Sequence, residues 1–154
     1  MIGALTVVLH VLVAAFSASV DGSYVAQTLN GRSLPADLRI PVDHGDVRLF
    51  RLEQGVLRLR NDGRFTLYFR YYHQLVRKGA KPTVTPVMSD SEEGLYTLKG
   101  SSLILTPTKK KGAKARPTIP ATVSAEEIRA SYELRDAVTQ ARVTLVMRRD
   151  ASYW

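Results

Sequence analysis

Beyond the first twenty residues, apolar and polar side chains alternate over short runs that Gly, Asn, Asp and Pro interrupt. This period of two predicts β-strands with one buried face, and no segment shows a convincing helical period. The expected strands are Ser23 to Leu29, Val47 to Arg60, Arg64 to Val76, Gly94 to Lys99, Ser102 to Thr108, Thr118 to Val123, Ile128 to Arg135 and Arg142 to Arg149, with a short additional one at Val84 to Met88. The pattern therefore predicts an all-β chain.

The register of the hairpin at "LRNDGRF" follows from the apolar pattern, because residues paired across antiparallel strands point to the same face. A two-residue turn at Asp62 and Gly63 would pair Leu59 with a threonine and break the apolar face. A three-residue loop that also includes Asn61 pairs Leu59 with Phe65 and keeps that face. We therefore expect the longer loop, with Gly63 in the left-handed conformation.

The same register arithmetic extends to the following hairpins, so that successive strands share one apolar face. The large side chains that it turns inward are Leu57, Leu59, Phe65, Leu67, Phe69, Tyr71, Tyr96, Leu98, Leu103, Leu105, Tyr132 and Met147. Between Leu52 and Leu57 the apolar phase changes. This change predicts either a bulge at Gly55 in one long bent strand or a tight hairpin at "EQG".

About eight sequential antiparallel strands with one apolar face each can form an up-and-down barrel or a sandwich. A sandwich would need several long crossovers, and the chain offers long connections at Asn30 to Asp46, Arg77 to Thr83 and Lys109 to Pro117. The tight hairpins favour the barrel. We therefore predict an antiparallel up-and-down β-barrel of about eight strands in residues 21–154.

The first twenty residues, "MIGALTVVLHVLVAAFSASV", carry no charged side chain. The apolar run from Ala4 to Phe16 has the length of a signal-peptide core, and small residues follow it where a signal peptidase could cut. An uncleaved membrane anchor, or a buried helix or strand, is the alternative. Because the chain has no cysteine, it can be neither a bacterial lipoprotein nor a disulfide-stabilised secreted domain. We therefore expect a bacterial exported protein, periplasmic or secreted, or one held in the membrane by its first segment.

Two stretches, "GSYVAQTLNGRSLP" and "GVLRLRNDGRFTL", resemble the first strands of small exported bacterial lipocalin-like domains, which are calycin-type barrels. In lipocalins the first strand begins with Gly-x-Trp, and an Arg on the last strand packs over that ring. Gly22 and Tyr24 match this start with Tyr in place of Trp, and Arg148 or Arg149 could make the same cation-π contact. The Thr-Asp-Tyr motif and a clear C-terminal helix are missing. The resemblance implies non-covalent binding of a small hydrophobic molecule in the barrel mouth, without chemistry.

The stretch "RFTLYFRYYHQL" contains five of the eleven Tyr and Phe residues, and its inward half faces the barrel interior. An eight-stranded barrel is at the size at which side chains either fill it or leave room for one small ligand. A packed core is one interpretation. The other is a pocket, whose candidate ligand-binding residues are Phe69, Tyr71, His73, Tyr96, Tyr132 and Met147.

Sequence motifs for catalysis are missing: the chain has no Gly-x-Ser-x-Gly elbow, His-Glu-x-x-His helix, phosphate-binding glycine loop or dinucleotide fingerprint. His44 lies between Asp43 and Asp46, but a solvated turn explains this group better than a metal site does. The carboxylates of Glu92, Glu93, Glu126 and Glu127 fall in expected turns, which predicts solvated side chains. We predict no catalytic residue, metal site or cofactor.

Positive charge is the second signal, with a net charge of +8. One expected loop gathers the candidate anion-binding residues Lys109, Lys110, Lys111, Lys114 and Arg116, and a second carries Arg77, Lys78 and Lys81. Such loops attract anionic lipid headgroups or nucleic acid. On the outer face, Arg64, Tyr68, Arg70 and Tyr72 resemble a platform for single-stranded nucleic acid, but the export segment argues against that partner.

The sequence thus leaves two functions open. The first is an exported lipocalin-like domain that binds a small hydrophobic or anionic ligand. The second is a structural or interaction module whose barrel is filled and whose basic loops contact an anionic envelope surface.

Overall fold

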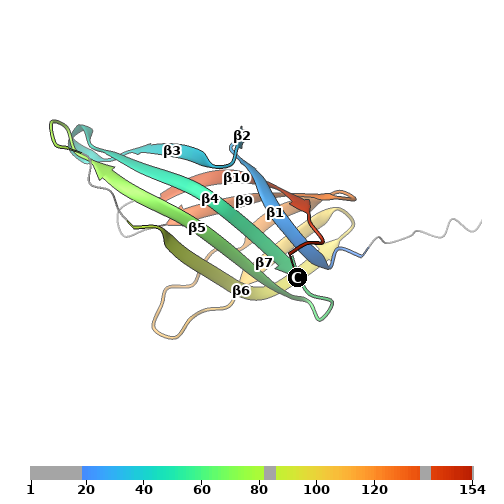
Figure 1. Cartoon of the computed structure of the whole chain (residues 1–154). Coiled ribbons are helices and arrows are strands. Elements are labelled where there is room, and N and C mark those ends of the chain that lie inside the picture. Colours follow the sequence, from blue (N-terminus) through green and yellow to red (C-terminus); the bar gives the residue numbers. More distant parts are fainter. Residues whose placement is uncertain (1–18, 82–85, 136–139, 154) are drawn as a thin grey trace, which may run out of the picture.

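The structure, a computed structural model, describes residues 19–81, 86–135 and 140–153 (Figure 1). The expected export segment lies outside these ranges except for Ser19 and Val20, as does the beginning of the expected strand at Val84 to Met88. Within the described ranges, no helix has the length and apolar content needed to cross a membrane.

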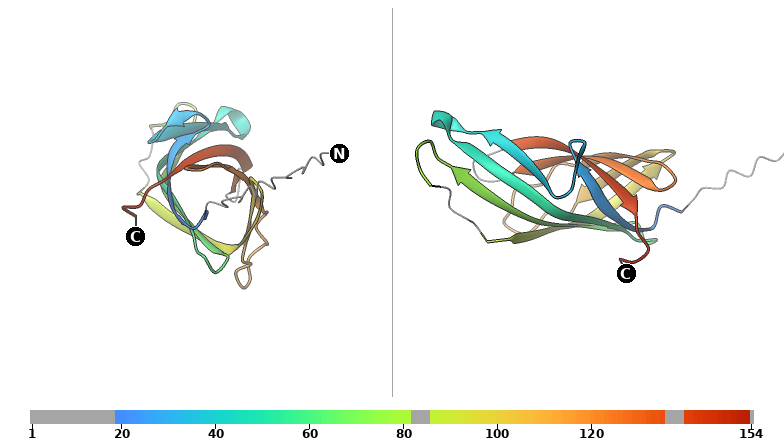
Figure 2. Two further views of the ribbon diagram at one scale, coloured as in Figure 1. Left: turned by 90° about the vertical axis from the view of Figure 1, so that its right-hand side faces the viewer. Right: turned by 45° about the horizontal axis from the view of Figure 1, so that its top comes forward.

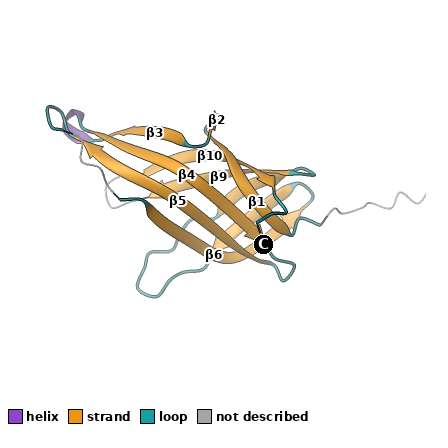
Figure 3. Cartoon of the chain, viewed as in Figure 1, coloured by secondary structure: helices purple, strands orange, loops and turns teal. Residues whose placement is uncertain are grey.

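The described residues form ten strands and one short 3₁₀-helix, Asp43–Gly45 (Figure 3). The strands are β1 (Gly22–Leu29), β2 (Arg32–Ser33), β3 (Ala36–Pro41), β4 (Val47–Leu59), β5 (Arg64–Val76), β6 (Met88–Lys99), β7 (Ser102–Pro107), β8 (Ile119–Val123), β9 (Glu127–Arg135) and β10 (Gln140–Arg149). Every pairing between them is antiparallel. The prediction of an all-β chain is confirmed.

Eight of these strands close into a barrel, which Figure 2 shows end-on. From β4 to β10 each strand pairs with the next, and β1 pairs with both β10 and β4. The closing seam joins Gly22 to Leu59 and Val25 to Val56. Beyond this seam, β3 pairs with the other half of β4. The architecture is the predicted up-and-down barrel and is consistent with a calycin-like barrel.

The β4–β5 hairpin has the predicted three-residue loop, because Leu59 pairs with Phe65 and the Arg60 amide donates to the Arg64 carbonyl at 2.9 Å. Gly63 has φ of 81°. β4 is one long strand, which excludes the alternative hairpin at "EQG". Its bulge lies at Glu53, between Leu52 and Gln54, rather than at Gly55.

Two sequence predictions of loops are wrong. The connection from Asn30 to Asp46 contains β2 and β3, and β6 begins at Met88 rather than at Gly94. The start of β6 was not predicted because the run "SDSEE" has no apolar residue to alternate. It is nevertheless a strand, because its backbone groups form the ladder with β5. Glu92 and Glu93 therefore lie in a strand.

The apolar core occupies the barrel interior as the register arithmetic predicted. Its members include Leu57, Leu59, Phe65, Leu67, Leu103, Leu105 and Met147, none of which is more than 2% exposed. Tyr71 and Tyr96 pack against this core as partly buried residues. Leu98 is 39% exposed because it lies near the end of β6.

Tyr24 and Arg149 hold one end of the barrel together. The Tyr24 ring is fully buried, and the Arg149 guanidinium carbon lies 5.3 Å from its centroid. The Tyr24 hydroxyl donates to the Val20 carbonyl at 2.9 Å and accepts from Arg149 Nη2 at 2.8 Å. The predicted cation-π contact is thus made by Arg149, whereas Arg148 pairs with Glu127.

Gly94 lets β6 pass close to β7, since a Cβ there would lie 2.0 Å from the Thr106 carbonyl oxygen and 2.8 Å from the Phe65 ring. We expect Gly94→Ala to lower the free energy of unfolding by about 1–3 kcal/mol, measured by urea denaturation. Gly55→Ala is the matched control, because its new Cβ would meet Ala26 Cβ at 3.1 Å and the Phe69 ring at 3.3 Å, contacts that a shift of a few tenths of an ångström relieves. An equal or larger loss in Gly55→Ala would contradict the account.

Candidate functional site

The two ends of the barrel differ. The start of β1, the end of β10 and the tight β4–β5, β6–β7 and β8–β9 turns lie at one end, which we call the closed end (Figure 1). The β3–β4 and β7–β8 connections and the residues that follow β5, Arg77 to Lys81, lie at the other, which we call the open end (Figure 2). Both basic loops predicted from the sequence therefore belong to the open end.

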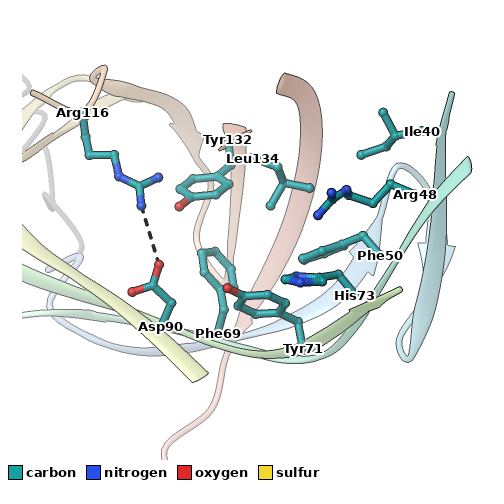
Figure 4. A pocket seen from close by; sticks show the side chains of 10 residues that line it. All are labelled: Ile40, Arg48, Phe50, Phe69, Tyr71, His73, Asp90, Arg116, Tyr132 and Leu134. Carbon is teal, nitrogen blue, oxygen red and sulfur yellow. Dashed lines mark ion pairs between the residues drawn. The ribbon is translucent and has the colours of Figure 1, made fainter. Parts of the chain in front are cut away.

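A pocket of about 90 Å³ lies inside the barrel near the open end (Figure 4). Its walls are Ile40, Arg48, Phe50, Phe69, Tyr71, His73, Asp90, Arg116, Tyr132 and Leu134. Deeper in the barrel, a second hollow shares several of these side chains and holds about 10 Å³, the room of a single water molecule. Of these two hollows inside the barrel, the aromatic pocket is thus the larger.

The pocket has aromatic walls and charged ends. Phe50 and Tyr71 pack with ring centroids 5.0 Å apart, and Phe69 packs on Tyr132 at the same distance. Figure 4 shows the β4 and β5 rings on one side, with Tyr132 and Leu134 of β9 opposite them. Arg48 lies at one end of this space, and the pair of Arg116 and Asp90 lies at the other.

The bulge at Glu53 explains why Phe50 reaches the pocket. In an unbroken strand Arg51 and Glu53 would share the inward face of Gly55. The extra residue changes the phase, so that Phe50 and Leu52 point inward and are 8% and 2% exposed. Arg51 is left on the outer face, where it pairs with Glu53 and Asp37.

A polar cluster adjoins the pocket and centres on Glu92, which is 6% exposed. The Tyr132 hydroxyl donates to Glu92 Oε1 at 2.5 Å. Arg116 Nη1 lies 3.4 Å from the same oxygen, and its Nη2 lies 3.6 Å from Asp90 Oδ2. The half-exposed guanidinium thus links a buried carboxylate to the barrel mouth.

The prediction that Glu92 is solvated is wrong, and the cause is its strand. Glu92 pairs with Leu67 across β5 and β6 and shares that residue's inward face. A buried carboxylate is tolerated when hydrogen-bonding and charged partners surround it, as Tyr132 and Arg116 do here. Burial, followed by the charge of Glu92, raises the pKa of the Tyr132 hydroxyl well above its usual value.

Of the predicted ligand-binding residues, Phe69, Tyr71, His73 and Tyr132 line this pocket. Tyr96 and Met147 do not: the Tyr96 hydroxyl donates to the Arg60 carbonyl at 2.7 Å near the closed end, and Met147 is fully buried in the core.

Sequence reasoning missed Ile40, Arg48, Phe50, Asp90 and Leu134 as parts of the pocket. Ile40 lies on β3, in a segment that the sequence predicts as a connection, and Asp90 lies in the first part of β6, which the apolar pattern does not predict. Leu134 follows Tyr132 by two positions and so shares its inward face, which was the signal that could have placed it in the pocket. The phase change beyond Leu52 was the available signal for Phe50 and Arg48.

The five predicted anion-binding residues all lie in the β7–β8 connection at the open end. Arg116 differs from Lys109, Lys110, Lys111 and Lys114, because it is turned towards the two carboxylates. No carboxylate pairs with any of these four lysines among the residues that the structure describes.

The remaining sequence candidates contribute less. His44 is exposed, and the Asp46 carboxylate accepts a hydrogen bond from the Lys78 amide at 3.1 Å. In the described part of the chain, no cluster of three His, Asp or Glu side chains could hold a metal ion. On the outer face, Tyr72 packs against Arg51, whose guanidinium carbon lies 5.8 Å from the ring centroid.

No protein-family model matches the chain, and no match is found among curated proteins or among solved structures.

The ion pair between the buried Glu92 and the half-exposed Arg116 can be tested by a double-mutant cycle on the free energy of unfolding. Arg116→Ala leaves the Glu92 carboxylate buried beside Tyr132 alone. In a Glu92→Gln background no carboxylate is left unpaired, so Arg116→Ala should lower the free energy of unfolding much less. We expect a coupling energy of about 1–3 kcal/mol from urea denaturation at neutral pH. Additive effects of the two substitutions would contradict a working ion pair.

The raised pKa of Tyr132 predicts a loss of stability in alkali. Below pH 10 both states hold the proton, but above it the unfolded chain releases the proton while the folded chain keeps it. The stability of the native chain relative to Tyr132→Phe should therefore fall by about 1.4 kcal/mol per pH unit above pH 10. Urea denaturation at several values from pH 9 to pH 11 measures this, and a difference that does not change with pH would contradict it.

Proposed function

We propose that this chain is an exported, non-enzymatic lipocalin-like domain that binds a small hydrophobic or anionic molecule at the open end of its barrel. The observation that carries the proposal is the aromatic pocket with a cation at each end, placed above a packed closed end. Apolar walls with a few directed polar groups are typical of small-molecule sites.

The size of the pocket sets how much of a ligand it would enclose. Drug-sized ligands occupy pockets of roughly 300–1,000 Å³. At about 90 Å³, this pocket encloses one ring or a short alkyl segment. The rest of a larger ligand would extend through the open end, between the basic loops.

The charges favour a ligand with a weakly acidic group. Arg48 and Arg116 line the pocket, against the single carboxylate of Asp90. Arg116 is shared between Asp90 and Glu92, so the positive field at the open end comes mainly from the lysine-rich loops around the pocket. An aromatic or short aliphatic carboxylate fits this combination.

The family assignment and the location belong to the same proposal. The contact between Tyr24 and Arg149 occupies the place where lipocalins pack an Arg over the ring of the first strand, and this likeness supports a lipocalin-like domain. The uncharged first twenty residues support export to the periplasm or the exterior, or retention by a membrane anchor.

A second candidate function is a structural module whose basic loops contact an anionic envelope surface. The small volume of the pocket and the lysines of the open end favour it. In this alternative the aromatic pocket has no ligand, and the open end faces the partner.

The binding proposal is tested by filling the pocket. Leu134→Trp places an indole in the aromatic pocket without removing a hydrogen bond, and Leu95→Trp adds the same group at an exposed position 59% open to solvent. We expect the native chain and Leu95→Trp to bind benzoate or to retain a copurified ligand, while Leu134→Trp loses at least about tenfold in affinity. Ligand-detected NMR and native mass spectrometry are the measurements, and equal binding by all three proteins would contradict the proposal.

A further inference from the structure

A third hollow, the outer cleft, lies outside the aromatic pocket between β6 and the β7–β8 connection. It holds about 410 Å³, and its walls come from Ser91 to Glu93 on one side and from Pro107 to Arg116 on the other. This volume is within the range of small-molecule sites, about 300–1,000 Å³.

The backbone holds the lysine-bearing wall of the outer cleft in place. The Thr108 amide donates to the Glu93 carbonyl at 2.7 Å, which anchors the connection to β6. The Ala113 amide donates to the Lys110 carbonyl at 3.1 Å, and Gly112 has φ of 80°, so the connection reverses direction there. This turn places lysines that precede and follow it along the same cleft.

Three lysines, Lys109, Lys110 and Lys114, line the outer cleft, whereas Lys111 at the turn does not. Lys110 Nζ reaches across to the Ser91 carbonyl at 3.3 Å. Glu93 also lines the cleft and offsets one positive charge. Glu92 lines the cleft as well, beside its partner Arg116. Three lysines and one arginine thus face two carboxylates. The outer cleft is therefore positive, with several ammonium donors facing one space.

We propose that the outer cleft binds a single phosphate group, carried by a soluble phosphomonoester or by a lipid headgroup. A phosphate ester has three strong acceptor oxygens and close to two negative charges, so it can engage several ammonium groups at once. A carboxylate has two oxygens and one charge. The three lysines that line the cleft therefore match phosphate better.

This site is separate from the aromatic pocket. Lys109 and Lys114 line the outer cleft and take no part in the pocket walls. Arg116 is the residue common to both spaces. Substitution of Lys109 and Lys114 can therefore abolish phosphate binding in the outer cleft while the aromatic pocket still binds its ligand. Equally, the aromatic pocket can prove empty while the outer cleft binds phosphate.

The experiment is a titration of the full chain with methyl phosphate at low salt, followed by calorimetry and by amide NMR shifts. We expect saturable binding, with the largest shifts around the β7–β8 connection. The double variant Lys109→Ala/Lys114→Ala should weaken binding at least about tenfold. The control Lys78→Ala/Lys81→Ala removes the same charge from the other basic loop and should change affinity less than about twofold.

Anionic vesicles distinguish the two sources of phosphate. If vesicles that contain phosphatidic acid bind the chain and methyl phosphate displaces them, the headgroup is the ligand. If methyl phosphate binds and the vesicles do not, the ligand is soluble, and both results support the site. Absence of saturable methyl phosphate binding, or an equal loss in the two double variants, would overturn the proposal.

Discussion

The seam between β1 and β4 is the constraint on which the rest of the structure depends. Without it, the strands from β4 through β10 to β1 would form an open sheet, and much of its apolar face would remain in water. Tyr24 lies at this seam, where it pairs with Leu57 on one side and with Arg149 on the other. The ring, the guanidinium and the backbone pairs therefore fix the closed end together.

Because the closed end holds the barrel together, the open end can carry polar and charged side chains on the inward face. Large aliphatic and aromatic side chains fill the interior next to the seam. Towards the open end, the same inward face of the strands carries His73, Asp90 and Glu92 instead. Glu92 is stable there because Tyr132 and Arg116 satisfy it, at the cost of tying Arg116 to the barrel. Polar chemistry is thus concentrated where loops and solvent meet the core.

The sequence predicted the parts of the fold that rest on alternation. The β5 bounds, the register of its hairpin and the inward position of Phe65 agree with the structure. Alternation also identified Phe69, Tyr71, His73 and Tyr132, which line the pocket.

The rest could not be predicted, because it depends on contacts between distant segments. β3 is short and exists through its pairing with β4, and Glu92 is buried because of Tyr132, forty positions away.

Hydrogen exchange of individual backbone amides tests the central claim, a barrel closed by the β1–β4 seam, most directly. The account predicts that amides bonded across this seam exchange as slowly as those of the β4–β5 hairpin core. Seam amides that exchange as fast as those of the β7–β8 connection would contradict it.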